Sequence, residues 1–282
     1  MKSFHIISLC SLILLNIAVF GQVTAQTNTA DEALLNNGNQ QGTTGLGMQG
    51  SYALLMQMVN DGSGDSMMNI QQFKIYTDRH FMYAHALPGD SLAYFGIGTY
   101  QIGDDKLVEY PFYTSSAGAQ VDTVEIKITK LGNGYVQVIN FPPDSSGRKV
   151  VLTEEYGNVS IPLTSPLDGA WKQTKASFIP NTGTTQTTTN PTQFKIYQSG
   201  KFIWGSTVQD STTSKPVSYF GYGTFEMKGR KEIEERTTNS TFRTSLIGKP
   251  VRVQLDFKGK DAYQQTITWP DGKSIETYER MK

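Results

Sequence analysis

The stretch Tyr94-Phe95-Gly96-Ile97-Gly98-Thr99-Tyr100 decides the fold, because it returns as Tyr219-Phe220-Gly221-Tyr222-Gly223-Thr224-Phe225 later in the same chain. A second stretch, Gln72-Phe73-Lys74-Ile75-Tyr76, returns as Gln193-Phe194-Lys195-Ile196-Tyr197. The matching residues are separated by about the length of one small domain, which indicates a tandem duplication.

Short runs of alternating apolar and polar residues dominate both copies and are interrupted by glycine-containing turns. The runs Val124–Ile128 and Val251–Leu255 show the period of two most plainly, which is typical of antiparallel strands with one face in solvent. Neither copy contains a long amphipathic helical pattern. A copy of about 110 residues has room for about eight to ten strands. The predicted fold class is therefore all-β, with each copy a small closed barrel or a sandwich.

Composition divides the chain into five segments. Lys2, the apolar run 4–20 and the small residues up to Ala25 are typical of a secretory signal, so we predict a cleaved signal peptide over 1–25. The polar segment 26–49 is predicted to be a flexible leader. The two copies occupy 50–160 and 169–282, and the proline-containing segment 161–168 links them. The mature protein is thus expected to be soluble and exported, to the periplasm or the extracellular space.

The residues that bind metals and cofactors are scarce. The single cysteine, Cys10, lies inside the predicted signal, so the mature chain would have no disulfide, thiol nucleophile or cysteine metal site. Its two histidines, His80 and His85, have no matching pair in the second copy, which argues against a zinc site. No helical pattern follows either glycine pair, so a nucleotide-binding loop is not expected. We predict neither a metal nor a cofactor.

The two copies carry opposite net charges. Residues 50–160 contain 7 Lys plus Arg against 12 Asp plus Glu, whereas residues 169–282 contain 17 against 10. The net values of −5 and +7 are compatible with unrelated solvated surfaces, and equally with an acidic domain 1 that docks on a basic domain 2. Nucleic acid is not an expected partner, because the basic residues are scattered along the chain. No transmembrane segment is expected after signal cleavage.

Aromatic residues shared by the copies fall on one strand face. Phe81 and Tyr83, like Phe202 and Trp204, are two residues apart and therefore point the same way, which we expect to be inward. His85 continues the face of Tyr83, at a position that we expect to lie at the barrel rim.

Two pairs of carboxylates recur in both copies. Inside a barrel they could approach one another as a general acid and base would, which leaves a hydrolase as a remote alternative. Buried glutamates that bond to tyrosine equally form structural networks, and we favour that role. No nucleophile elbow or Ser-His-Asp set accompanies them, so we predict a protein that is not an enzyme. The pairs are Glu109 with Glu154, and Glu234 with Glu276.

The repeated pattern resembles the lipocalin-like domains of exported bacterial proteins, many of them of unknown function. Copy two carries nearly all of it: Gly169-Ala-Trp171, Lys201-Phe202-Ile203-Trp204, Gly221–Phe225, Glu234 and Glu276-Thr-Tyr278. Copy one departs at Tyr52 and Tyr83, where the pattern has tryptophan. The resemblance covers both copies and implies two calycin-type up-and-down barrels, each able to hold one small apolar ligand.

The leading functional hypothesis is a protein that holds a small apolar or amphipathic molecule inside one or both barrels. The candidate ligand-binding residues are Phe81, Tyr83, His85, Tyr100, Glu109, Tyr156, Phe202, Trp204, Phe225, Glu234 and Tyr278. The alternative is a glycan- or protein-binding scaffold with solidly packed barrels, which would bind through loops and the aromatic residues Tyr110, Phe112 and Tyr113.

Overall fold

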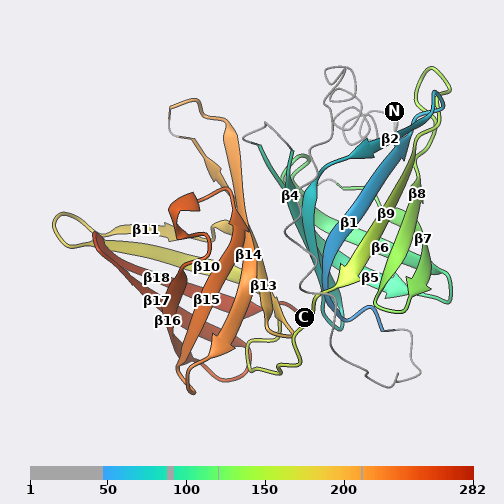
Figure 1. Cartoon of the computed structure of the whole chain (residues 1–282). Coiled ribbons are helices and arrows are strands. Elements are labelled where there is room, and N and C mark those ends of the chain that lie inside the picture. The colour runs from blue at the N-terminus through green and yellow to red at the C-terminus, as the bar shows by residue number, and fades with distance from the viewer. Residues whose placement is uncertain (1–46, 88–91, 120, 211) are drawn as a thin grey trace.

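The computed structural model describes residues 47–87, 92–119, 121–210 and 212–282, and in this part the regular secondary structure is almost entirely β-strand (Figure 1). It forms two antiparallel barrels in tandem, which confirms the predicted fold class. The predicted signal peptide and most of the leader lie outside the described residues.

Each barrel is built from nine consecutive strands. The strands of the first barrel are β1 (Gly50–Asn60), β2 (Asp65–Met68), β3 (Gln71–Tyr76), β4 (His80–Ala86), β5 (Ala93–Ile102), β6 (Lys106–Thr114), β7 (Val124–Leu131), β8 (Gly134–Asn140) and β9 (Val151–Asn158). Those of the second are β10 (Gly169–Pro180), β11 (Gln186–Thr189), β12 (Thr192–Gln198), β13 (Lys201–Gln209), β14 (Pro216–Met227), β15 (Glu232–Ser240), β16 (Pro250–Phe257), β17 (Ala262–Trp269) and β18 (Gly272–Arg280).

Each barrel closes because its first strand pairs on both sides. One edge of β1 pairs with β9, whereas the other edge pairs with β3 along its first part and with β2 along its last part. β2 and β3 thus share one position around the barrel, and β11 and β12 do the same beside β10. All other neighbours are consecutive in sequence. The result is an up-and-down barrel with eight strand positions and no open edge.

Aromatic residues fill one end of each barrel. In the first barrel, Tyr52, Tyr76, Phe81, Tyr135 and Tyr156 are buried in a single cluster. The equivalent cluster in the second barrel contains Trp171, Tyr197, Phe202, Phe225, Tyr263 and Tyr278. These rings close one end of each barrel with packed side chains, and any cavity is confined to the remaining part.

The repeated glycines of β5 and β14 make room for their neighbours. A Cβ atom on Gly221 would lie 2.6 Å from the Trp204 ring, and one on Gly223 would lie 2.1 Å from the backbone oxygen of Arg236. Gly223 also marks a β-bulge in the pairing of β14 with β15, and Gly98 marks the equivalent bulge in the first barrel. The glycines therefore allow a close backbone approach and a bend at the barrel corner, as their spacing predicts.

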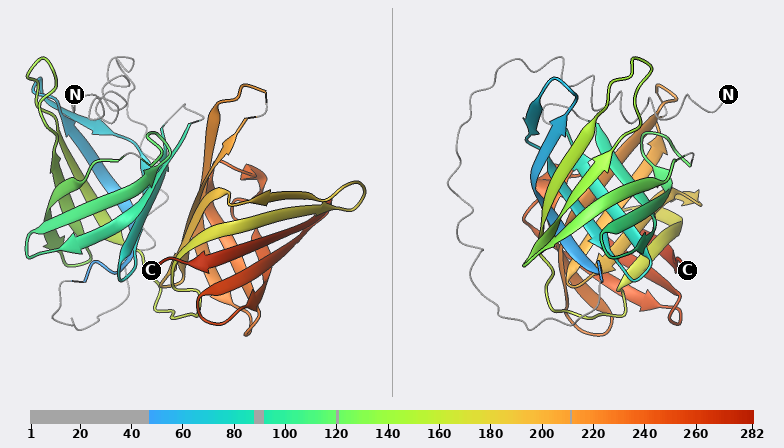
Figure 2. Two further views of the ribbon diagram at one scale, coloured as in Figure 1. Left: turned by 180° about the vertical axis from the view of Figure 1, so that it is seen from behind. Right: turned by 90° about the vertical axis from the view of Figure 1, so that its right-hand side faces the viewer.

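The outer faces of β3–β5 and β12–β14 contribute to one hydrophobic cluster between the barrels, which lie side by side in Figures 1 and 2. Phe73 of β3 stacks on Tyr222 of β14 with ring centres 4.7 Å apart. A Cβ atom on Gly205 would lie 2.4 Å from the Phe95 ring of the other barrel. These strands are thus apolar on the outside, where a barrel in water would normally be polar.

Candidate functional site

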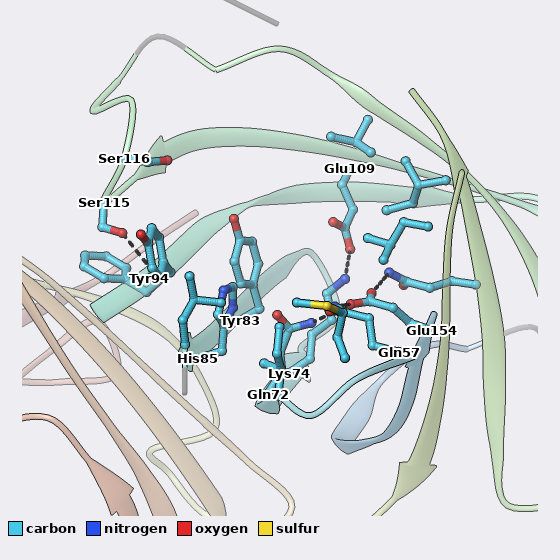
Figure 3. A pocket seen from close by; sticks show the side chains of 18 of the residues that line it. Gln57, Gln72, Lys74, Tyr83, His85, Tyr94, Glu109, Ser115, Ser116 and Glu154 are labelled. Carbon is cyan, nitrogen blue, oxygen red and sulfur yellow. Dashed lines mark hydrogen bonds and ion pairs between the residues drawn. The ribbon is translucent and has the colours of Figure 1, made fainter. Parts of the chain in front are cut away.

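A cavity of about 170 Å³ occupies the part of the first barrel that the aromatic end does not fill (Figure 3). Its wall combines apolar side chains from several strands with a group of polar ones. The polar and aromatic side chains that line it are Gln57, Gln72, Lys74, Tyr83, His85, Tyr94, Phe95, Glu109, Ser115, Ser116, Gln137, Phe141 and Glu154.

A buried ion pair lies at the inner end of this cavity. The ammonium group of Lys74 is 2.7 Å from Oε1 of Glu109, and both side chains are about 95% removed from solvent. The Tyr76 hydroxyl donates to the same carboxylate oxygen at 2.5 Å. Lys74 Nζ also lies 5.3 Å from the centre of the Tyr76 ring and 5.6 Å from that of Phe81. These contacts compensate both charges for the loss of water.

A second buried carboxylate, Glu154, accepts hydrogen bonds from four side chains. Gln57 donates at 2.6 Å, Gln137 at 2.5 Å and the Tyr156 hydroxyl at 3.0 Å, while Gln72 donates at 3.3 Å. Burial raises the pKa of Glu154, and Lys74 and the donors oppose that rise. Both oxygens of Glu154 are occupied by fixed donors, so the structure gives this carboxylate a role in a hydrogen-bond network.

His85 lies further along the cavity, between two tyrosine rings. Its ring centre is 6.2 Å from that of Tyr83 and 5.3 Å from that of Tyr94, in stacked arrangements. Its Nδ1 atom is buried and has no hydrogen-bond partner among the described residues. Burial lowers the pKa of His85 to about 4, so the imidazole is neutral at neutral pH. It offers one hydrogen-bonding atom to a ligand in the cavity.

The second barrel contains a larger cavity of about 540 Å³ with an equivalent polar inner end. Lys195 Nζ is 2.7 Å from Oε1 of Glu235, to which the Tyr197 hydroxyl donates at 2.5 Å. Oε2 of Glu276 accepts hydrogen bonds from three donors, namely Gln173 at 2.9 Å, Gln265 at 2.9 Å and the Tyr278 hydroxyl at 2.6 Å. The two barrels thus retain the same buried charges and tyrosines.

The residue equivalent to Glu109 is Glu235. The expectation that Glu234 lies inside the barrel as a ligand-binding residue is wrong. Glu109 pairs with Tyr100 across β5 and β6, and Glu235 pairs with Phe225 across β14 and β15. The turn before Glu235 is one residue longer than the turn in the first barrel. Because side chains alternate along a strand, this one-residue shift turns Glu234 to the outer face, where it pairs with Arg236.

The other candidate residues divide between the cavities and the packed ends. Tyr83, His85 and Glu109 line the first cavity, and Trp204 and Tyr278 line the second. The other five belong to the aromatic clusters instead of the cavity walls: Phe81, Tyr100, Tyr156, Phe202 and Phe225. They do point inward, but at the end of the barrel where neighbouring rings already fill the space.

Sequence reasoning missed the buried lysines and glutamines. The signal was present, because Gln72, Lys74 and Tyr76 alternate along one strand face and the same three residue types recur in the second copy. A lysine between two apolar residues is equally typical of a strand with one face in solvent, so its recurrence alone does not place it inside the barrel. Its partner lies on a distant strand, so the sequence does not show which glutamate it is.

Comparison with known proteins leaves the family open. No known protein family and no curated protein matches the sequence. Solved structures with some similarity include a redesigned β-barrel, at 16% identity and a TM-score of 0.27, which covers 43% of this chain and 97% of that one. A protein of unknown function from the DUF3598 family of Nostoc punctiforme has 11% identity and a TM-score of 0.26, covering 83% and 96%. A protein of Bacteroides fragilis, provisionally named an outer membrane protein, has 10% identity and a TM-score of 0.24, covering 83% and 97%.

Two further features of the described residues concern membranes and metals. None of the helices there has the length and apolar character needed to cross a membrane. Within the same ranges, no three side chains of the metal-binding types come together as a ligand set.

Proposed function

We propose that this chain is an exported binding protein without enzymatic activity, which holds a small apolar or amphipathic molecule inside its second barrel. The single observation that carries the proposal is the cavity of about 540 Å³ in that barrel, lined by Trp204, Tyr219, Phe242 and Trp269. Small-molecule sites occupy about 300–1,000 Å³ and combine apolar walls with a few polar groups. The proposal includes export of the protein and a lipocalin-like character of the two barrels.

The first barrel supports a smaller ligand. Its cavity of about 170 Å³ is similar in size to an engineered cavity of about 150 Å³ that holds benzene. The free Nδ1 atom of His85 adds one hydrogen-bonding position. A ligand with a single ring and one polar substituent would fit this volume and reach this hydrogen-bonding atom.

The carboxylates support binding over catalysis. A general acid or base needs a free oxygen within reach of the substrate. In the first barrel, Oε1 of Glu109 binds both Lys74 and Tyr76, while Glu154 accepts bonds from four fixed donors. Glu154 therefore has both oxygens occupied, and Glu109 is held through one oxygen in a buried ion pair, so we assign both carboxylates a structural role.

The scaffold alternative receives less support. Phe112 and Tyr113 both pack against Phe194 of the other barrel, with ring centres 5.9 Å and 5.6 Å away, and so do not form an open aromatic surface. Tyr110 remains 37% exposed. That alternative also requires solidly packed barrel interiors, whereas both barrels contain a cavity.

Purification from the native host followed by native mass spectrometry tests the binding proposal. We expect a small apolar adduct that denaturation releases, and we expect Ser206→Phe to remove it, because Ser206 lines the second cavity and a benzyl group would fill part of the space. Ser146→Phe in an exposed turn of the first barrel is the control and should keep the adduct. A bare wild-type mass, together with unchanged tryptophan fluorescence on titration with decanol, would contradict the proposal.

We also propose that the acidic first barrel stays docked on the basic second barrel in solution. The support comes from the shared apolar cluster and from the bond that Ser51 Oγ donates to the Gln198 carbonyl at 3.2 Å. The opposite net charges form no direct contact between the barrels, because every ion pair among the described residues lies within one barrel.

Phe73→Asp, which places a charge in the cluster, should increase the radius of gyration in small-angle X-ray scattering. Tyr110→Asp should leave it unchanged, and an unchanged value for both variants would argue against docking.

A further inference from the structure

The mouth of the second cavity carries a cation between aromatic rings. The guanidinium carbon of Arg243 lies 4.2 Å from the centre of the Trp269 ring and 5.7 Å from that of Phe242. Phe242 in turn meets Trp204 and Tyr219 edge-on, with ring centres 6.4 Å and 5.4 Å away. These five residues all line the cavity. The mouth therefore combines a positive charge with an apolar collar.

Arg243 is available for a partner of opposite charge. It is exposed, and no carboxylate of the described residues forms an ion pair with it. Its backbone is left-handed, with φ 49° and ψ 51°, where it precedes the short helix η2 (Thr244–Leu246). Residues other than glycine rarely adopt this conformation. From this position the side chain packs on the Trp269 ring.

The described residues at the equivalent positions of the first barrel carry neither this cation nor this ring. The backbone NH of Phe95 donates to Ser115 Oγ at 3.0 Å, and that of Phe220 donates to Thr241 Oγ1 at 3.0 Å, so Ser115 and Thr241 occupy equivalent positions. The two residues that follow are Ser116 and Ala117 in the first copy, but Phe242 and Arg243 in the second. The cation and the aromatic ring are therefore particular to the larger cavity.

We propose that the second cavity binds an anionic amphiphile, with its acidic headgroup on Arg243 and its apolar tail inside the barrel. This rests on the proposed binding function and names the ligand class. The inner end of the cavity favours the same orientation: Lys195 is already paired with Glu235, and Glu276 adds a further carboxylate there. An acidic headgroup at the inner end would face two carboxylates, whereas at the mouth it meets an unpaired guanidinium, which holds carboxylates well.

Tryptophan fluorescence offers a direct test, because all three tryptophans of the chain, Trp171, Trp204 and Trp269, belong to the second barrel. Decanoate, decanol and decyltrimethylammonium each have a chain of ten carbon atoms, with the carboxylate carbon counted in decanoate, and they differ in headgroup charge. Each is titrated at neutral pH, below its micelle concentration, into the full chain. We expect decanoate to bind about tenfold more tightly than decanol, and the cationic compound to bind most weakly.

Arg243→Gln should reduce decanoate affinity about tenfold, to the level of decanol, and leave decanol affinity unchanged. The control Arg230→Gln changes an exposed arginine in the turn at the opposite end of the barrel and should affect neither compound. Equal wild-type affinity for decanoate and decanol, or an Arg243→Gln variant that keeps the preference for decanoate, would overturn this inference while leaving the binding function in place. If none of the three compounds binds, the inference and the binding function for this barrel both fail.

Discussion

Lys74→Met is expected to lower the free energy of unfolding of the first barrel by about 3–5 kcal/mol, because it leaves the Glu109 carboxylate buried without its cation. Only the Tyr76 hydroxyl would remain on the oxygen that Lys74 now contacts. Urea unfolding followed by circular dichroism measures the change. Tryptophan fluorescence, which reports on the second barrel alone, shows in the same samples whether the loss is confined to the first.

Two further variants separate the buried pair from ordinary charge removal. Lys106→Met breaks the pair with Glu125, whose side chains are 50% and 71% exposed, and should change stability little. The double variant Lys74→Met with Glu109→Met removes both charges and should recover much of the loss. If the Lys74→Met protein is as stable as the Lys106→Met control, the prediction is wrong, and the neighbouring groups compensate the Glu109 carboxylate without Lys74.

Acidification from pH 7 to pH 4 is expected to destabilise the first barrel through His85. Burial lowers the pKa of this imidazole from its ordinary 6.5 to about 4, so between these pH values the unfolded chain binds a proton that the folded chain does not. The contribution of His85 to the free energy of unfolding is therefore fully present above about pH 6.5 and is lost as the pH falls towards 4. The full difference amounts to roughly 2–4 kcal/mol.

His85→Gln removes this titration and should flatten the dependence of stability on pH over the same range. Glu109, Glu154 and Lys74 line the same cavity and are present in both proteins, so the difference between the two curves isolates His85. Urea unfolding at several pH values, followed by circular dichroism, gives both curves. Parallel curves for the wild type and the variant would mean that the imidazole is solvated well enough to take up a proton in the folded barrel.

The strand Gln71–Tyr76 shows where the usual pattern of a soluble barrel is inverted. Its inward face presents Gln72, Lys74 and Tyr76 to a polar interior, while Phe73 and Ile75 point outward into the cluster between the barrels. Alternation in the sequence predicts a strand with two unlike faces. It does not say that the apolar face lies outside, because that depends on the second barrel beside it.

The sequence by itself determined the duplication, the all-β class and the inward direction of the shared aromatic residues, since all three follow from local patterns of period two and their recurrence. It also placed Tyr83, His85, Glu109, Trp204 and Tyr278 on the faces that line the cavities.

Only the tertiary structure decided which carboxylate faces inward, how much space remains inside each barrel and what surrounds its mouth. Glu235 replaces Glu234 because one extra turn residue reverses the alternation on β15. Cavity volume depends on how side chains from all eight strand positions pack together, and the charge of the mouth depends on Arg243 reaching Trp269 from a loop 26 residues earlier in the chain. Such contacts join segments distant in sequence, and no local pattern encodes them.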